Sequence, residues 1–149
     1  MTGIVPARPE DADAVRALVR AAYAHYVPRI GREPAPMTAD YAALIAAGHV
    51  WVTDGALVGV IVLIPQAGHL QVDNVAVDPA ARGTGVGAAL LAFAEERARA
   101  LGRPQLRLYT NAAMHENLAY YPRRGYTETH RATESGFHRV YFQKQTPPR

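Results

Sequence analysis

The chain has 149 residues, a length that suits one domain and is enough to bury a hydrophobic core. Its composition of 49% hydrophobic and 19% charged residues excludes a disordered chain, and the absence of Cys excludes disulfides, thiolate catalysis and Cys-ligated metal. The net charge is only +3 and the Arg residues are scattered along the chain, so we do not expect nucleic acid as a partner.

The first residues lack the cationic start and apolar core of a signal peptide. No apolar run approaches the ~20 residues that span a bilayer. We therefore expect a single domain over residues 1–149, located in the cytoplasm and without a membrane partner. All but one of the 16 Lys and Arg residues are Arg, which reflects either genomic composition or an anionic ligand, since Arg binds phosphate with a rigid fork.

The chain begins with a short strand-like segment followed by a helix. Pro9 and the acids after it mark the helix start, and apolar residues from Val15 to Tyr26 fall on one helical face. A Pro-rich loop then separates this helix from a second one, which ends at Gly48 and has Thr38 or Asp40 near its cap.

The middle of the chain predicts a hairpin, a strand and a long helix. Residues 49–66 are rich in β-branched residues on both sides of Asp54-Gly55, a strong turn signal. Residues 69–77 read as the next strand. Residues 86–101 have helical apolar spacing and stop before Gly102.

The last third predicts a strand at residues 105–110, a helical segment at 113–125 and two strands at 126–133 and 137–144 around a turn. The strand–helix–strand order across residues 70–110 implies a parallel pair. The whole order predicts an α/β fold, a mixed sheet of about seven strands with helices on its faces.

The segment "VDNVAVDPAARGTGVGAALL" joins the end of a strand to the start of the long helix and carries Gly83, Gly85 and Gly87. Unpaired N–H groups and the helix dipole make such a place an anion site. A P-loop is excluded because Gly87-Ala88-Ala89 stands where Gly-Lys-Ser/Thr is needed. A dinucleotide loop is disfavoured because the next strand ends without an acid. A tight turn without a ligand is the structural alternative.

Two motifs together carry a family resemblance. Residues 82–87, "RGTGVG", fit R/Q-x-x-G-x-G/A and follow the strand "NVAVDP"; the later segment "NLAYYPRRGY" places Asn and Tyr before a Gly-aromatic pair. The chain thereby resembles the GCN5-related N-acetyltransferases (GNAT) in these motifs, and in element order and length over essentially its whole length. The resemblance implies a splayed parallel strand pair that binds acetyl-CoA in its gap.

The resemblance also implies how acetyl-CoA, the co-substrate, is held. Backbone groups of three strand residues would pair with the pantetheine arm: Val75, Ala76 and Val77. Backbone N–H groups of the loop would hold the pyrophosphate: Gly83, Thr84, Gly85, Val86, Gly87 and Ala88. Arg82 would lie beside the pyrophosphate or brace the loop. Asn117 would hydrogen-bond the pantetheine, although the commonest family Asn lies farther upstream, where this chain has Met114.

For the chemistry, Tyr121 lies four residues before Gly125, as the family's general-acid tyrosine does. A core-packed aromatic is the alternative for Tyr121, and we expect Tyr120 to serve packing. Asp73 is the nearest acid for a base, although a solvated or capping Asp and a water relay fit as well. Strand alternation predicts that Gln71 and Asp73 share one face and that Asn74 takes the other.

The acceptor is expected against the loop between the first two helices, where Tyr23 and Tyr26 could line a pocket and Arg29 and Arg32 could attract an anion. No metal is expected, because the His residues lack ligand spacing. The resemblance implies an N-acetyltransferase that acts by direct attack of a primary amine, carried by a small molecule or a peptide. A non-catalytic acyl-CoA-binding sensor is the alternative. The family often dimerises, so a homodimer is also an expectation.

Overall fold

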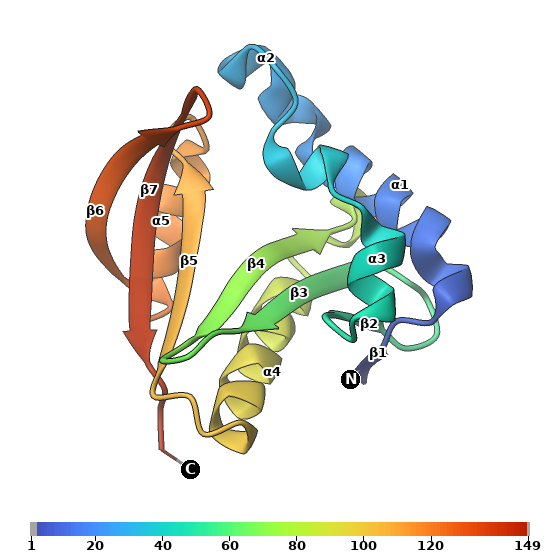
Figure 1. Ribbon diagram of the computed structural model, residues 1–149. Helices are drawn as coiled ribbons and strands as arrows, with labels where there is room; N and C mark the ends of the chain where they lie inside the picture. The colour runs from blue at the N-terminus through green and yellow to red at the C-terminus, as the bar shows by residue number, and fades with distance from the viewer. Residues whose placement is uncertain (1–2, 149) are drawn as a thin grey trace.

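The computed structural model describes residues 3–148 and contains a seven-stranded mixed sheet with helices on both faces (Figure 1). The strand order across the sheet is β1-β2-β3-β4-β5-β7-β6. The strands are β1 (Ile4–Pro6), β2 (Val50–Thr53), β3 (Gly59–Pro65), β4 (Leu70–Val77), β5 (Gln105–Asn111), β6 (Thr127–Glu134) and β7 (Phe137–Gln145). The helices are α1 (Ala12–Tyr23), α2 (Val27–Ile30), α3 (Tyr41–Ala46), α4 (Val86–Ala100) and α5 (His115–Arg123). The predicted α/β architecture and the parallel β4–β5 pair are confirmed.

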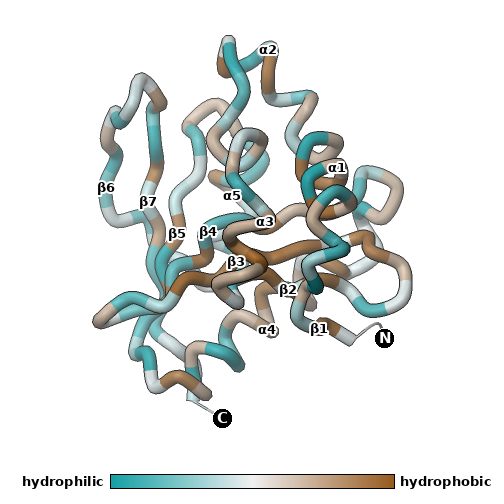
Figure 2. Tube along the Cα trace, turned by 45° about the vertical axis from the view of Figure 1, so that its right-hand side comes forward, coloured by the Kyte–Doolittle hydropathy of each residue, from teal (hydrophilic) through white to brown (hydrophobic). Residues whose placement is uncertain are grey.

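Two hydrophobic cores lie on opposite faces of the sheet. On one face α1 and α3 bury Val15, Val19 and Tyr41 against β2 and β3. On the other face Leu90 and Ala94 of α4 pack in a cluster that also contains Tyr121 of α5. β3 supplies side chains to both cores, which is why it is hydrophobic along its length while the edge strand β6 is hydrophilic (Figure 2).

The loops refine the sequence-based expectations. The β2–β3 turn is five residues long, 54–58, and Thr53 Oγ1 stabilises it by accepting from the N–H groups of Val58 and Gly59. Asp40, one of two expected caps, accepts from Ala43 N at 3.1 Å at the start of α3. The Pro-rich segment, expected to be a loop, contains α2 and a 3-10 turn at Ala35–Thr38.

The parallel strands β4 and β5 diverge along their length. They pair only at Leu70 with Leu106 and Gln71 with Arg107, at the N-terminal end of each strand. β5 then follows β7, with which it pairs over all seven of its residues, while β4 stays with β3. Figure 1 shows the two strands separating like the arms of a V. The last half of β4 therefore has no strand partner on its β5 side.

A β-bulge in β4 corrects the expected alternation of side chains. Val62 of β3 is opposite Asn74 and Leu63 is opposite Val72, so Asp73 is an extra residue without a partner on β3. Leu70 and Val72 face the α4 side, whereas beyond the bulge Ala76 packs on the α1 side. Asn74 was expected opposite Asp73, but it contacts Tyr23 of α1 and Tyr41 of α3, so both polar residues reach the same face.

Within residues 3–148, no helix combines the length and apolarity needed to cross a membrane. The same part of the chain has no group of three His, Asp or Glu side chains that could hold a metal ion.

Candidate active site

Backbone groups of β4 line the gap between the two diverging strands. Asp78 N donates to Val58 O at 2.8 Å, and hydrogen-bonded pairs alternate along an antiparallel ladder. Ala76 therefore directs its N–H and C=O toward β3, opposite Val60, whereas Val75 and Val77 direct theirs toward the gap. Of the three strand residues expected to pair with an extended ligand, Val75 and Val77 can do so and Ala76 cannot.

The glycine loop ends at the N-terminus of α4 with a row of free donors. None of the backbone N–H groups from Gly83 to Ala88 donates a hydrogen bond within residues 3–148; the first helical bond runs from Ala89 N to Gly85 O. These groups border a cavity of about 870 Å³ that opens to solvent. Oriented N–H groups at the positive end of a helix dipole form a site for an anion such as a phosphate.

The three glycines of the loop have different reasons for being there. Gly83 and Gly85 have φ of +78° and +90°, and nothing lies within 4 Å of where a Cβ would stand. Their need is therefore conformational. Gly87 lies in α4 and lines the cavity, and its Cβ would come 3.4 Å from the hydroxyl of Tyr120. Gly87 is thus the position where a missing side chain leaves room for a ligand.

Arg82 braces this loop, one of the two roles left open for it. Its Nη2 donates to Ala22 O near the C-terminal end of α1 at 2.9 Å. Thr84 Oγ1 donates to Ala81 O and closes the turn. The loop is therefore closed by its own hydrogen bond and fixed to α1 before any ligand arrives.

Tyr120 and Arg124 were not expected at the site, but both line the cavity beside the glycine loop. The guanidinium of Arg124 lies over the ring of Tyr120, 5.1 Å from its centroid. They are one helical turn apart, and Asn117 precedes Tyr120 by three residues, so helical spacing places all three on one face of α5. That spacing was the signal that could have found them.

Tyr121 packs in the core with its ring and also borders the cavities. Its ring packs in the core, 5.7 Å from the ring of Tyr126 and 5.9 Å from that of Phe142. Its hydroxyl has no hydrogen-bond partner among the described residues, and the side chain lines three adjoining cavities. Burial raises the pKa of Tyr121 well above its ordinary value, so the phenol keeps its proton.

Asn117 lies one turn before Tyr121, and its Nδ2 donates to Thr110 Oγ1 of β5 at 3.0 Å. Asn117, Tyr121 and Val75 are the residues that line all three cavities. The cavities therefore meet at this triplet, which we call the junction. Asn111 Oδ1 accepts from Ala113 N at 2.9 Å in the turn that precedes α5.

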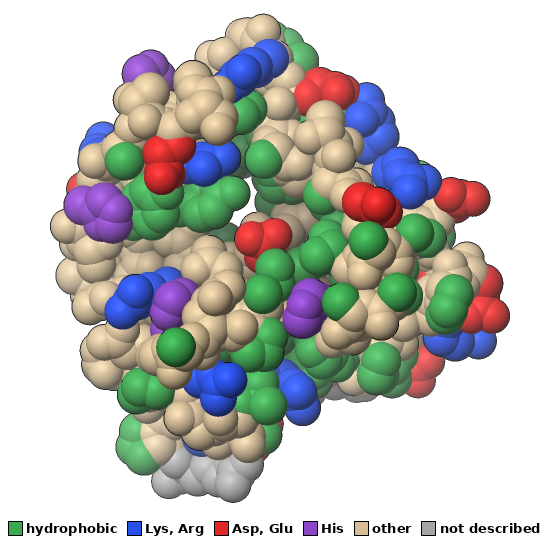
Figure 3. All heavy atoms as spheres, in the orientation of Figure 1, with side chains coloured by type: hydrophobic (Ala, Val, Ile, Leu, Met, Phe, Trp, Pro, Cys, Tyr) green, Lys and Arg blue, Asp and Glu red, His purple; other side chains and the backbone are tan. Residues whose placement is uncertain are grey.

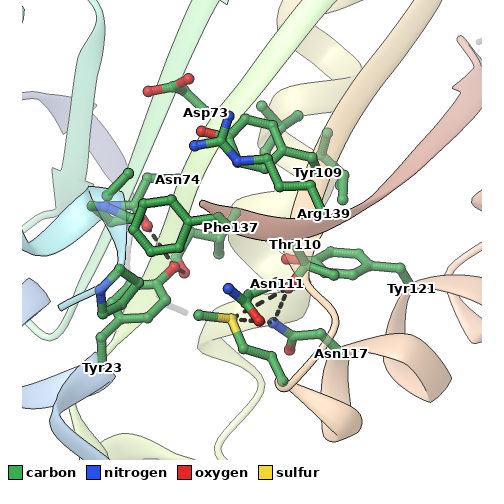
Figure 4. Close-up of a pocket in the computed structure, with 17 residues that line it drawn as sticks. Tyr23, Asp73, Asn74, Tyr109, Thr110, Asn111, Asn117, Tyr121, Phe137 and Arg139 are labelled. Carbon is green, nitrogen blue, oxygen red and sulfur yellow. Dashed lines mark hydrogen bonds between the residues drawn. The ribbon is translucent and has the colours of Figure 1, made fainter. Parts of the chain in front are cut away.

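The cavity on the α1 face of the junction, of about 550 Å³, has mainly aromatic and apolar walls and is called here the acceptor cavity (Figure 4). Tyr23 reaches it from α1, and its hydroxyl lies 2.7 Å from Asn74 Oδ1 and 3.1 Å from Val75 O. Tyr109 and Phe137 form the wall on β5 and β7. Asp73 and Arg139 are the charged residues of the lining. Figure 3 shows this face hollowed there, with an acidic side chain inside.

Arg29, an expected acceptor residue, does not line the acceptor cavity. Its guanidinium contacts both carboxylate oxygens of Glu116 in α5, at 2.6 and 3.1 Å, and lowers the pKa of Glu116 to about 2. Tyr26 borders a neighbouring cavity with His25 and the junction residues. Arg32 lies over the ring of Phe137, 3.6 Å from its centroid. The two arginines thus tie the α2 segment to α5 and to β7.

Comparisons with known proteins agree with this geometry. The family model described as "Acetyltransferase (GNAT) family" matches residues 14–126. No curated protein matches the chain. Nourseothricin acetyltransferase is 30% identical with a TM-score of 0.60, and the match covers 66% of this chain and 64% of that one.

Two further solved structures contain coenzyme A or acetyl-CoA. The PaiA N-acetyltransferase from Thermoplasma acidophilum, in complex with coenzyme A, is 16% identical with a TM-score of 0.80, over 97% of this chain and 99% of that one. A GNAT family acetyltransferase from Elizabethkingia anophelis with acetyl-CoA bound is 17% identical with a TM-score of 0.58, over 69% and 79%. At these identities the likeness is one of fold.

Proposed function

Because this chain belongs to the GNAT acetyltransferase family, we propose that it is an N-acetyltransferase that passes the acetyl group of acetyl-CoA directly to a primary amine. One observation carries the proposal: the cavity beside the glycine loop, the part of β4 without a partner strand and an aromatic cavity all meet at Val75, Asn117 and Tyr121. Two substrates that enter from opposite sides would have their reacting ends at this junction.

On the donor side, the free N–H groups from Gly83 to Ala88 hold the pyrophosphate. Arg124 adds a cation at the same cavity. The pantetheine arm takes the place of the missing strand beside Val75 and Val77, and its amides pair with their backbone groups as in strand addition. Asn117 lies where the arm reaches the junction.

At the junction, a neutral amine nitrogen attacks the thioester carbonyl and forms the new C–N bond. The backbone N–H of Val75 faces the gap and stabilises the oxyanion of the tetrahedral intermediate. The C–S bond then breaks, and Tyr121 gives its proton to the sulfur. Burial disfavours the tyrosinate that this transfer leaves, so Tyr121 takes back a proton from the water that receives the amine's proton, and the net products are the amide and the neutral thiol.

The proton lost by the amine goes to a water molecule. Among the described residues no carboxylate lines all three cavities that meet at the junction. Asp73 lines the acceptor cavity, but it lies away from Asn117 and Tyr121 (Figure 4). Free amines are mostly protonated at neutral pH, with pKa values of about 10. The rate at saturating acetyl-CoA should therefore rise with pH as the neutral amine becomes more abundant.

The test is an assay of CoA thiol release with acetyl-CoA and a panel of amines that includes nourseothricin, because an acetyltransferase named for it is similar to this chain. Amine-dependent release with an acetylated product in mass spectrometry supports the proposal. Tight CoA binding without transfer to any amine would instead support a non-catalytic acyl-CoA sensor.

A further inference from the structure

Asp73 is the acidic residue of the acceptor cavity and has no partner there. No hydrogen bond or ion pair joins its carboxylate to another group among the described residues. Burial raises its pKa above the usual value. A carboxylate that is partly withdrawn from water and left unpaired costs stability. A ligand group that completes its coordination would offset that cost.

The bulge is what brings this carboxylate into the cavity. Because Asp73 is the extra residue of β4, its side chain and that of Asn74 both emerge on the α1 face. Both ends of the Asn74 amide are engaged, since Oδ1 accepts from the Tyr23 hydroxyl at 2.7 Å and Nδ2 donates to the Tyr41 hydroxyl at 3.0 Å. The amide fixes the strand at the bulge, and the adjacent carboxylate remains free.

Two positive groups act on Asp73, and neither neutralises it. Arg139 of β7 faces the same cavity, but no ion pair joins the two residues. The guanidinium of Arg139 lies over the ring of Tyr109, 4.4 Å from its centroid, and is 3.5 Å from Glu134 Oε1, which balances its charge. His49 is the other group; it does not line the cavity. The uncompensated charge of the acceptor cavity is therefore negative.

The position of Asp73 matters as much as its charge. Figure 4 shows Asp73 at the end of the acceptor cavity opposite Asn117. Asp73 precedes Val75 by two positions along β4, a span of about 7 Å. The nitrogen that attacks must be neutral and must lie at the junction, so it cannot be the group that an ionised Asp73 holds. Arg139 and Arg32 already lie over the rings of Tyr109 and Phe137, so among the described residues Tyr23 is the ring of this lining, apart from Tyr121 at the junction, with no cation over it.

We infer that Asp73 binds a second, cationic group of the acceptor. The preferred substrates are therefore diamines or longer polyamines. Their free ammonium group lies at Asp73, while another nitrogen of the same molecule reacts at the junction. This inference rests on the proposed acetyl transfer. Asp73 is then a specificity-determining residue, not the base that removes the proton.

The experiment compares 1,4-diaminobutane with n-pentylamine, which has the same number of heavy atoms and one charge fewer. We measure kcat/KM for both amines with wild type, Asp73→Asn and the control Asp13→Asn, which removes an equal charge at a side chain that is 98% exposed on α1. Wild type and the control should prefer the diamine by about tenfold or more, the usual gain from a charge-assisted contact. Asp73→Asn should lose that preference, so that the ratio of kcat/KM for the diamine to kcat/KM for n-pentylamine falls about tenfold or more.

Two results would overturn the inference while leaving acetyl transfer intact. One is a wild type without preference for the diamine. The other is an equal loss for both amines in Asp73→Asn with a changed pH profile, which would identify Asp73 as the base. Calorimetry of 1,4-diaminobutane with the CoA-loaded protein separates the two proposals. Binding that weakens about tenfold in Asp73→Asn upholds the cationic site even if no amine is acetylated, and equal or absent binding overturns it.

Discussion

At the scale of single residues, the hydroxyl of Tyr121 is the group whose removal tests the chemistry most directly. The hydroxyl faces the junction without a partner among the described residues, while the ring packs in the core. Tyr121→Phe keeps the ring, so folding and CoA affinity should be retained. The turnover number should fall about tenfold or more, because the leaving thiolate loses its proton donor. Steady-state kinetics and CoA titration together check both halves of this expectation.

Tyr126→Phe is the matched control for that variant. The ring of Tyr126 lies 5.7 Å from that of Tyr121, but its hydroxyl is buried without a hydrogen-bond partner in residues 3–148 and lines no cavity described above. Its removal should leave turnover unchanged and raise the free energy of unfolding by about 1 kcal/mol, because a buried unpaired hydroxyl is lost. Equal turnover of wild type and Tyr121→Phe would remove Tyr121 from the mechanism.

The glycine loop gives a second prediction at this scale. Gly87→Ala should fold normally, since Ala is a better helix former than Gly and the position has an ordinary backbone conformation. Its methyl group occupies the cavity beside the glycine loop, so the dissociation constant of CoA should rise about tenfold.

Gly85→Ala should behave differently, losing about 1 kcal/mol of stability at a φ of +90°. Denaturant unfolding and calorimetry distinguish the two variants.

At the scale of secondary-structure elements, long periodic segments were predictable and local irregularities were not. The α4 helix and the strands β5 and β7 follow from apolar spacing alone. The bulge in β4 has no signature, because "LQVDNVAV" alternates equally well with or without an extra residue. Asn74 was therefore assigned to the wrong face. The roles of Tyr120 and Tyr121 depend on the rotation of α5, which is set by the contacts of Tyr121 with Tyr126 and Phe142.

The tie between α2 and α5 yields a pH prediction. Arg29 holds the pKa of Glu116 at about 2, below its usual 4.5, so the pair stabilises the fold above about pH 4.5 and is lost as the pH falls toward 2. Both side chains are substantially exposed, so solvent screens the pair and the gain in stability is small. Glu116→Gln should unfold slightly more easily than wild type at pH 7, and the difference should vanish near pH 2. Unfolding measured across that range checks the sign.

The control for this pair is Glu128→Gln, which removes a similar exposed ion pair within β6. Amide exchange of residues 27–32 at pH 7 should speed up in Glu116→Gln and stay unchanged in Glu128→Gln. Equal exchange in both variants would show that the ion pair does not hold α2 in place.

At the scale of the whole molecule, the two layers of helices and the sheet were predictable, but the distance between them was not. Hydrophobic spacing shows which face of α4 is buried, but it does not show how closely the helix approaches the sheet. Gly59 decides that distance: a Cβ there would lie 2.7 Å from Val86 Cγ1 and 3.1 Å from Leu90 Cδ1. The reason for this glycine in a strand appears only when α4, about 30 residues later in the chain, is packed against it.

Gly59→Ala therefore tests how the packing of the layers controls the donor site. The methyl group should push the first turn of α4 away from β3, since Val86 is the first residue of that helix and has no room to shift inward. Overpacking of this kind costs about 1–3 kcal/mol. The same turn carries the free N–H groups of the glycine loop, so CoA affinity should fall together with stability. Gly68→Ala, where no atom lies within 4 Å of the added carbon, should change neither. A Gly59→Ala protein with reduced stability and unchanged CoA affinity would show that the loop keeps its geometry independently of α4 packing, through Arg82 and its bond to Ala22.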